Sequence, residues 1–378
     1  MARVEDCLNI ADLRALAEHR LPRSIRPLLD GAAEDGLTAD RNVSAFENVS
    51  LLPRCLVDVT EVATRTALLG QTLEWPVYCS PTGASRLFHP DGELAVARAA
   101  ASTGTVYGLS SNSTHPLEVV AAAAPGPKFF QLFLFKDRTL TYQLMERCRA
   151  AGYQALLLTV DVPVRGNCER EQRLAQSWSV RAALSFATHP AWSLGQLRRG
   201  RLSIPIMGDR GAVRSFRAES AALGAQLDAS TTWKDVREVV DRWRGPCAVK
   251  GIMTADDARR AVDHGATAVV VSNHGGRQLD GVAASLEALP AIAAALKDRA
   301  EITMDGGIRR GVHVLKALAL GARACGVGRA YLYGLAAGGE AGVARTLQLL
   351  RTEFTRALQL TGCRDVRDID SSLVRHLE

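Results

Sequence analysis

Aromatic residues are scarce in this sequence, at 5 % of 378 residues, and long apolar runs are missing. No run approaches the ~18 apolar residues that a membrane-crossing helix needs. The first twenty residues contain acids and lack the apolar segment of a secretory signal, so we expect a cytoplasmic protein. Hydrophobic residues make up 47 % and charged residues 23 %. These proportions exclude a disordered, collagen-like or coiled-coil chain and predict a globular domain with a sizeable core.

Cysteine patterns that bind zinc are also absent. The eight cysteines are scattered, no pair has CxxC spacing and none lies in a cluster with histidine, so we predict no metal site. We interpret them as mostly buried apolar thiols in a reducing compartment, not as a disulfide framework.

Short β-branched segments alternate with helical segments rich in Ala, Leu and Arg. The predicted strands are Pro76–Ser80, Thr105–Leu109, Lys128–Phe133, Ala155–Val160, Cys247–Lys250, Ala268–Ser272, Glu301–Met304 and Ala324–Val327. The predicted helices include Gly92–Ala101, Thr139–Ala151, Ala255–His264, Ser285–Lys297 and Gly311–Leu320. Eight such βα units predict an α/β fold, the (β/α)8 TIM barrel. A doubly wound sheet is the alternative, but it normally carries a GxGxxG turn, which this sequence lacks.

The length predicts a single barrel domain over residues 1–378 with two additions. One is an N-terminal helical extension, residues 1–70. The other is an insertion or lid loop between strands four and five, residues 170–232.

The insertion is strongly basic. From Trp178 to Arg217 it contains seven arginines, one acid and no lysine, which accounts for the whole net charge of +6 on the chain. The charged residues are Arg181, Arg198, Arg199, Arg201, Asp209, Arg210, Arg214 and Arg217, and Trp178, Phe186, Trp192 and Phe216 are interleaved with them. One interpretation is a solvated loop, and another is contact of residues 178–217 with an anionic membrane surface. Because the rest of the chain is formally neutral and no binding motif accompanies the arginines, we expect no nucleic-acid binding.

The most informative run is SNHGGRQLDG, residues 272–281, directly after an apolar strand. Catalytic side chains of a barrel lie at the carboxyl ends of its strands. His274 suits a general base near neutral pH, and Arg277 offers a rigid fork for a carboxylate. Loop residues of these types are often only solvated, but their place at a strand end favours a catalytic role.

Two glycine-rich turns follow the last two strands, DGGIRRG at 305–311 and GVGR at 326–329. Many barrels bind a phosphate at this place. Glycine amides together with Arg309 and Arg329 would hold a phosphate dianion, whereas the alternative is a pair of ordinary turns.

Polar side chains also end the other strands. Lys250 could hold a negative charge that develops on a cofactor, or extend to solvent. Asp161 could orient His274 and stabilise its cation, or cap a helix. The polar groups that suit the rim of a planar heterocycle are Pro81–Gly83, Ser110–Asn112, Gln131 and Thr159.

These motifs together resemble the FMN-dependent 2-hydroxy acid oxidases and dehydrogenases. The resemblance runs from about residue 8 to 370 and is carried by SNHGGRQLDG, DGGIRRG, VKGI, SPTG, FFQL, LTVD and HPDGELAVARAA. Gly83, HPAWSLGQLRRG, LDASTTW and GRAYLYGLAAGGEAGV look most similar to the mandelate and lactate dehydrogenase subgroup. Some of these also recur in a branch of the family that acts on a peptide-derived substrate.

The resemblance implies FMN as cofactor, a small-molecule substrate and a homotetramer. The residues it implies for FMN are Pro81, Thr82, Gly83, Ser110, Gln131, Thr159, Lys250, Ser272, Asp305, Gly307, Arg309, Gly328 and Arg329. It implies His274 as the base, Asp161 as its partner and Arg277 as the carboxylate clamp. Lys250 would then stabilise the anionic reduced flavin.

The sequence departs from the family pattern at three positions that would contact the substrate. Leu28 and Phe133 stand where the family has tyrosines, and Cys168 stands where it has a second carboxylate-binding arginine. A hydrogen bond to a charged group is worth about 1.5–3 kcal/mol, so the three losses should weaken binding of a small free 2-hydroxy acid. We therefore expect an enlarged, more apolar pocket.

The sequence thus predicts FMN-dependent oxidation of a bulky or aryl 2-hydroxy acid to the 2-oxo acid. One alternative is oxidative tailoring of an amine, amide or carrier-bound substrate in a biosynthetic pathway, and another is a catalytically impaired flavin-binding homologue. The electron acceptor stays open among oxygen, a quinone and a partner protein.

Overall fold

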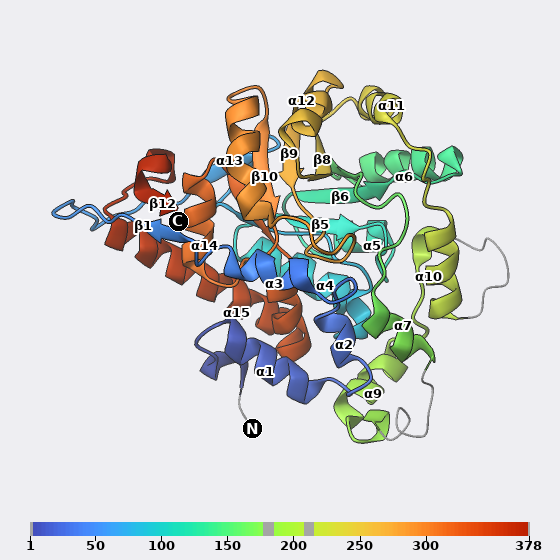
Figure 1. Cartoon of the computed structure of the whole chain (residues 1–378). Helices are drawn as coiled ribbons and strands as arrows, with labels where there is room; N and C mark the ends of the chain where they lie inside the picture. Colours follow the sequence, from blue (N-terminus) through green and yellow to red (C-terminus); the bar gives the residue numbers. More distant parts are fainter. Residues whose placement is uncertain (1–2, 177–184, 208–214, 377–378) are drawn as a thin grey trace.

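Eight parallel strands close into a barrel in the computed structural model, which describes residues 3–176, 185–207 and 215–376 (Figure 1). Around the barrel the strands are β10 (Glu301–Asp305), β11 (Ala324–Val327), β4 (Val77–Cys79), β5 (Tyr107–Ser110), β6 (Lys128–Phe133), β7 (Ala155–Thr159), β8 (Cys247–Ile252) and β9 (Ala268–Val271). The predicted (β/α)8 barrel is confirmed, and each predicted strand overlaps one of these eight.

A helix follows every barrel strand, and each of these helices except the last returns the chain to the start of the next strand. In strand order from β4 these helices are α4 (Gly92–Ser102), α5 (Leu117–Ala122), α6 (Arg138–Ala150), α11 (Trp233–Trp243), α12 (Ala255–Asp263), α13 (Ser285–Leu296), α14 (Gly311–Ala319) and α15 (Arg329–Thr361). A short 3-10 helix, η2 (Ser85–Leu87), precedes α4. The ring of helices covers the outer face of the barrel, so the strands are buried on both faces.

Alternate residues of the barrel strands face its interior. The apolar cluster that fills the interior includes Tyr78, Phe129, Leu157, Ala248 and Val270. Because side chains of a strand alternate between two faces, the inward position two residues further along each of these strands belongs to the barrel mouth. These positions are Ser80, Gln131, Thr159, Lys250 and Ser272. The barrel is therefore apolar inside and polar at the carboxyl ends of its strands.

Part of the N-terminal segment pairs with the C-terminal segment outside the barrel. The N-terminal segment forms η1 (Val4–Asp6), α1 (Ile10–Arg20), α2 (Arg26–Leu29), α3 (Leu37–Ser44) and β1 (Val49–Leu51), then a hairpin of β2 (Thr66–Leu68) and β3 (Gln71–Leu73). The C-terminal segment forms η4 (Val366–Asp368), η5 (Ser371–Leu373) and β12 (Val374–His376). β1 pairs antiparallel with β12, and α1 packs against α15. The N-terminal segment is thereby tied to the last residues of the chain.

The insertion between β7 and α11 is largely helical in its described part. It contains α7 (Glu169–Gln176), α9 (Pro190–Arg198), η3 (Pro205–Met207) and α10 (Phe216–Ala225). Trp178, Arg181, Asp209, Arg210 and Arg214 of the predicted basic segment lie outside the described residues.

Two arginines of the insertion pair with acids. Arg199 forms an ion pair with Asp91, and Arg201 forms one with Glu219. Part of the predicted basic charge is therefore neutralised locally. No helix within residues 3–176, 185–207 and 215–376 is both long and apolar enough to cross a membrane.

Candidate active site

His274 and Asp161 form a pair at the barrel mouth. The Nδ1 atom of His274 lies 3.1 and 3.2 Å from the two carboxylate oxygens of Asp161. His274 has a left-handed backbone with φ of 59°, followed by Gly275 and Gly276 at 65° and 74°. Gly275 and Gly276 adopt this conformation without strain, whereas His274 adopts it with a side chain, as residues at functional sites sometimes do. Burial alone raises the pKa of Asp161, but His274, with help from Lys250, lowers it below its usual value.

Lys250 belongs to a second polar network on the same rim. Its ammonium donates to Ser272 Oγ at 2.7 Å and lies 3.1 Å from Asp305 Oδ2. Asp305 also accepts from Ser272 Oγ at 2.5 Å and from Ser80 Oγ at 2.8 Å. Ser272 Oγ in turn accepts the backbone N–H of His274 at 3.1 Å. The ammonium group of Lys250 is thus held in one orientation, and the network connects it to the turn that carries His274.

The ends of β5, β6 and β7 bring further predicted residues side by side. The strand register places Ser110 beside Gln131, and Thr159 between Phe133 and Lys250. Ser110 Oγ donates to Gln131 Oε1 at 3.1 Å. Among the described residues, Gln131 Nε2 and Thr159 Oγ1 are buried and have no protein partner. A buried donor without a partner costs free energy, so these two groups point to a bound polar molecule.

Three arginines converge beside the N-terminal segment. Arg329 donates to the carbonyls of Gly275, at 2.8 Å, and of Gly31. Burial, together with the neighbouring charges of Arg277 and Arg309, lowers the pKa of Arg329 to about 10. This concentration of positive charge beside the glycine turn after β10 suits a phosphate dianion.

The three departures from the family pattern lie on the same side of the barrel. Phe133 ends β6 beside Thr159, and its ring packs edge-on against Phe135 at 6.3 Å between centroids. Leu28 is half-buried on α2, which contacts α7. Cys168 is buried, and its thiol donates to the carbonyl of Arg277 at 3.5 Å. The structure therefore brings Cys168 to the predicted carboxylate clamp.

One residue of the site was not predicted from the sequence. Glu171, in the first turn of α7, accepts a hydrogen bond from Arg277 Nη2 at 2.7 Å. The two residues are 106 positions apart. The only signal in the sequence is an acid three residues after Cys168, and no spacing rule connects it to Arg277.

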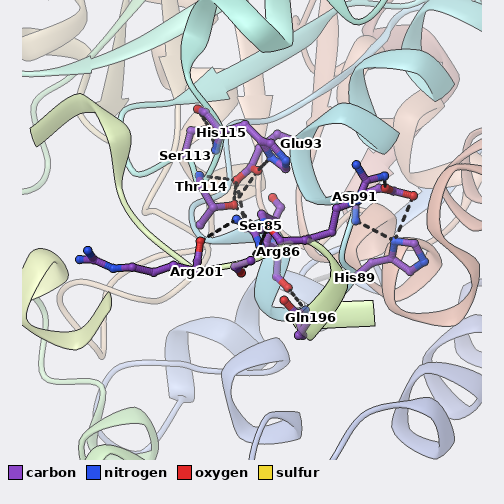
Figure 2. Close-up of polar contacts among 12 residues, drawn as sticks. Ser85, Arg86, His89, Asp91, Glu93, Ser113, Thr114, His115, Gln196 and Arg201 are labelled. Atoms are coloured by element: carbon purple, nitrogen blue, oxygen red, sulfur yellow. Dashed lines mark hydrogen bonds and ion pairs between the residues drawn. The ribbon is translucent and has the colours of Figure 1, made fainter. Parts of the chain in front are cut away.

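A buried carboxylate anchors two loops of the mouth (Figure 2). Glu93 has no exposed surface. It accepts from the backbone N–H groups of Ser85 and Thr114 at 3.1 and 2.9 Å and from Thr114 Oγ1, and His115 Nδ1 lies 2.8 Å away. Ser85 follows the turn at residues 81–83, and Thr114 follows the turn at 110–112. Glu93 therefore joins the two turns predicted to meet a heterocycle.

The insertion docks on the first of these loops. Arg86 donates to the carbonyls of residues 199–201 at the end of α9, at 3.0 to 3.1 Å. Trp192 Nε1 donates to the carbonyl of Leu87 at 3.1 Å, and Gln196 donates to the carbonyl of Arg86. The position of α9 is thus coupled to the loop at the mouth.

Comparison with known proteins identifies the family. A profile described as FMN-dependent dehydrogenase matches residues 17–376. The chain belongs to the FMN-dependent dehydrogenase family. It is 42 % identical to an L-lactate oxidase from Nostoc sp., over 99 % of this chain and all of that one.

Two solved structures are similar to this chain in both sequence and fold. A structure of the monotopic membrane protein (S)-mandelate dehydrogenase is 35 % identical, with a TM-score of 0.94 over 98 % of this chain and 100 % of that one. A substituted mandelate oxidase with 2-hydroxy-phenylacetamide is 37 % identical, with a TM-score of 0.81 over 95 % and 96 % of the two chains. The protein is an FMN-dependent oxidoreductase of the 2-hydroxy acid oxidase and dehydrogenase type.

The site of this FMN-dependent dehydrogenase fits its cofactor. The unpartnered donors of Gln131 and Thr159 suit the carbonyl oxygens of a flavin ring, and Lys250 beside them suits its negative edge when reduced. Arg309 and Arg329 suit the phosphate. The predicted residues at the ends of β6, β7, β8, β10 and β11 therefore lie on one rim.

Proposed function

We propose that this enzyme oxidises the Cα–OH group of a bulky or aryl 2-hydroxy acid, of the mandelate kind, to the 2-oxo acid. The observation that carries the proposal is the pair of His274 and Asp161 on the rim that also holds Lys250 and the unpartnered donors Gln131 and Thr159. A base, a cation and a heterocycle site on one rim are what alcohol oxidation with a flavin requires.

His274 is the proton acceptor in this proposal. Its Nδ1 atom is held by Asp161, so the opposite ring nitrogen is the one available to the substrate, and the carboxylate stabilises the imidazolium that forms. FMN, when bound, supplies the two-electron acceptor. Lys250 holds a positive charge at the rim, and Arg277 is the group that meets the substrate carboxyl.

The shape of the substrate follows from the apolar positions. Leu28, Phe133 and Cys168 replace groups that would each contribute about 1.5–3 kcal/mol to holding a charged substrate. A substrate with a large apolar group recovers this loss through buried area, at about 25 cal/mol per Å². The same positions also fit the alternative, an amide or carrier-bound substrate of a tailoring step.

Anaerobic flavin reduction tests the proposed function. The flavin-loaded protein is mixed with mandelates, lactate, longer 2-hydroxy acids and amine analogues, and the loss of flavin absorbance is followed. We expect reduction by aryl and long-chain 2-hydroxy acids and little by lactate. Reduction by amines alone would favour the tailoring alternative, and no reduction by any compound would favour the impaired homologue.

The insertion supports a second proposal, contact with a membrane surface. On α9, Leu194 and Leu197 are 52 % and 77 % exposed, and Arg198 beside them is exposed too. Apolar side chains next to arginine suit insertion into an anionic interface. Co-sedimentation with vesicles containing phosphatidylserine tests this: replacing both leucines by serine should release the protein. Replacement of Leu8, 74 % exposed on the N-terminal segment, should not.

A further inference from the structure

The guanidinium fork of Arg277 is already engaged by groups of the protein. Its Nη2 donates to Glu171 Oε1 at 2.7 Å, and its Nη1 donates to the carbonyl of Gly31 at 3.0 Å. A planar guanidinium binds a carboxylate most strongly through two parallel N–H groups. The carboxylate of Glu171 therefore already uses part of the fork that a substrate carboxylate would use.

The local chain is shaped to admit this contact. A Cβ atom at Gly31 would lie 2.4 Å from Glu171 Oε1 and 2.7 Å from Arg277 Nη1, so a side chain there would push the pair apart. On the other side, a Cβ at Gly166 would lie 2.2 Å from the carbonyl of Arg277. α2 and α7 are in contact here, and Figure 1 shows them side by side below the barrel. Two glycines thus leave room for Glu171 to reach Arg277.

Electrostatics favour the pair. Burial alone lowers the pKa of Arg277, but the charge of Glu171 raises it above its usual value. Both side chains are about one-third exposed, at 33 % for Arg277 and 27 % for Glu171, so solvent reaches the contact and the pair can separate.

None of the residues at the three departures replaces Arg277 as a receptor for a carboxylate. The thiol of Cys168 donates to the carbonyl of Arg277, and Leu28 and Phe133 have no polar side-chain atoms. Arg165, the nearest other arginine on this loop, donates to Ser220 on α10. A free acid that binds Arg277 must therefore share it with the carboxylate of Glu171 or displace that carboxylate.

We propose that Glu171 is a specificity-determining residue: its carboxylate competes with the substrate carboxylate for Arg277, so the site favours 2-hydroxy acyl substrates whose acyl group is uncharged, such as amides and esters. This inference rests on the proposed function, in which Arg277 meets the substrate carboxyl. A neutral carbonyl needs only one donor and brings no second anion beside Glu171. A small free acid brings that anion and has little apolar surface with which to offset the cost.

Binding of a matched pair of unreactive ligands tests the proposal. Phenylacetate and phenylacetamide have the same size and lack the hydroxyl group, so neither can be oxidised. Their dissociation constants are measured by calorimetry on the FMN-loaded enzyme. In the wild type we expect the amide to bind at least as tightly as the acid. In Glu171→Gln we expect the acid to bind about tenfold tighter, equivalent to about 1.4 kcal/mol, and the amide to change less than about twofold.

Two further variants control the experiment. Glu169→Gln removes an acid of the same helix that pairs with Arg173, and it should leave both constants unchanged. Glu171→Ala repeats the test if the glutamine variant loses FMN. Unchanged or weaker binding of phenylacetate in the Glu171 variants would overturn the proposal, because it would mean that Glu171 only holds Arg277 in place. Failure of the proposed function is recognised separately, by a wild-type flavin that no 2-hydroxy compound reduces.

Discussion

The substitution Glu93→Gln should destabilise the loops at the mouth of the barrel. Glu93 itself is buried where no substrate reaches it. Glu93 is fully buried, and its carboxylate receives hydrogen bonds from Ser85, Thr114 and His115. Glutamine has the same size and keeps one acceptor oxygen for the two backbone N–H groups. Its amide nitrogen, however, replaces the oxygen that faces His115 and the hydroxyl of Thr114.

The expected cost follows from these contacts. Each hydrogen bond to a charged group contributes about 1.5–3 kcal/mol, and glutamine loses the two that reach the second carboxylate oxygen, from His115 and from the hydroxyl of Thr114. Because glutamine retains part of the network, we expect a loss of about 3 kcal/mol in the free energy of unfolding. We also expect weaker FMN binding, since Glu93 holds the turns at 81–83 and 110–112 together.

The dependence on pH gives an independent check. Burial by itself raises the pKa of Glu93, but the bonds from His115 and Thr114 outweigh it, and the net pKa lies below the ordinary value of 4.5. A carboxyl whose pKa is lower when folded stabilises the protein above pH 4.5, and this stabilisation is lost as the pH falls through the folded pKa. The difference between wild type and variant should therefore be full at neutral pH and shrink in acid.

Thermal unfolding followed by circular dichroism, with and without FMN, measures the effect. The control is Glu118→Gln, which removes one partner of a surface pair with Arg147 and should cost less than about 1 kcal/mol. The reasoning is refuted if Glu93→Gln unfolds within the range of that control, or if the deficit grows as the pH is lowered.

Three further substitutions act at the rim. His274→Ala should slow anaerobic flavin reduction by about 10²–10⁴-fold while the protein stays yellow, and a colourless variant would contradict the separation of base and flavin site. Phe133→Tyr should raise kcat/KM for lactate about tenfold through one new hydrogen bond to the charged substrate, and no gain with FMN bound would show that this position does not limit substrate choice. Thr159→Val should weaken FMN binding about fivefold, measured by flavin fluorescence, without lowering the stability of the apoprotein, because the hydroxyl has no protein partner. Equal losses of FMN binding and of apoprotein stability would mean that the hydroxyl stabilises the fold. The matched control is Thr60→Val, at an exposed position.

The barrel was predictable from sequence because each strand is a short, doubly buried apolar run. β6 and β11 have the predicted bounds, and α4 ends within a residue of its prediction. The inward alternation then carries over to function: Leu157 faces the core, and Thr159, two residues later, faces the mouth. Local periodicity is sufficient for that step.

What sequence reasoning missed depends on contacts between distant segments. β8 extends two residues past its prediction, with a register shift after Lys250 that no local pattern signals. The contact of Glu171 with Arg277 needs α7, the turn after β9 and the small residue Gly31 to meet in space. Likewise, the arginines at the end of α9 and just after it look like free charge in the sequence, yet Arg199 pairs with Asp91, which lies 108 positions earlier in the chain. Side chains of this kind are placed by tertiary packing and not by their neighbours in the chain.

The pairing of β1 with β12 has a consequence for the order in which the protein folds. β1 occupies residues 49–51 and β12 occupies residues 374–376, and all eight barrel strands lie between them in the chain. Bringing two such distant segments together costs loop-closure entropy that a short two-stranded sheet offsets poorly by itself. We therefore expect β1 and β12 to pair only after the barrel between them has formed.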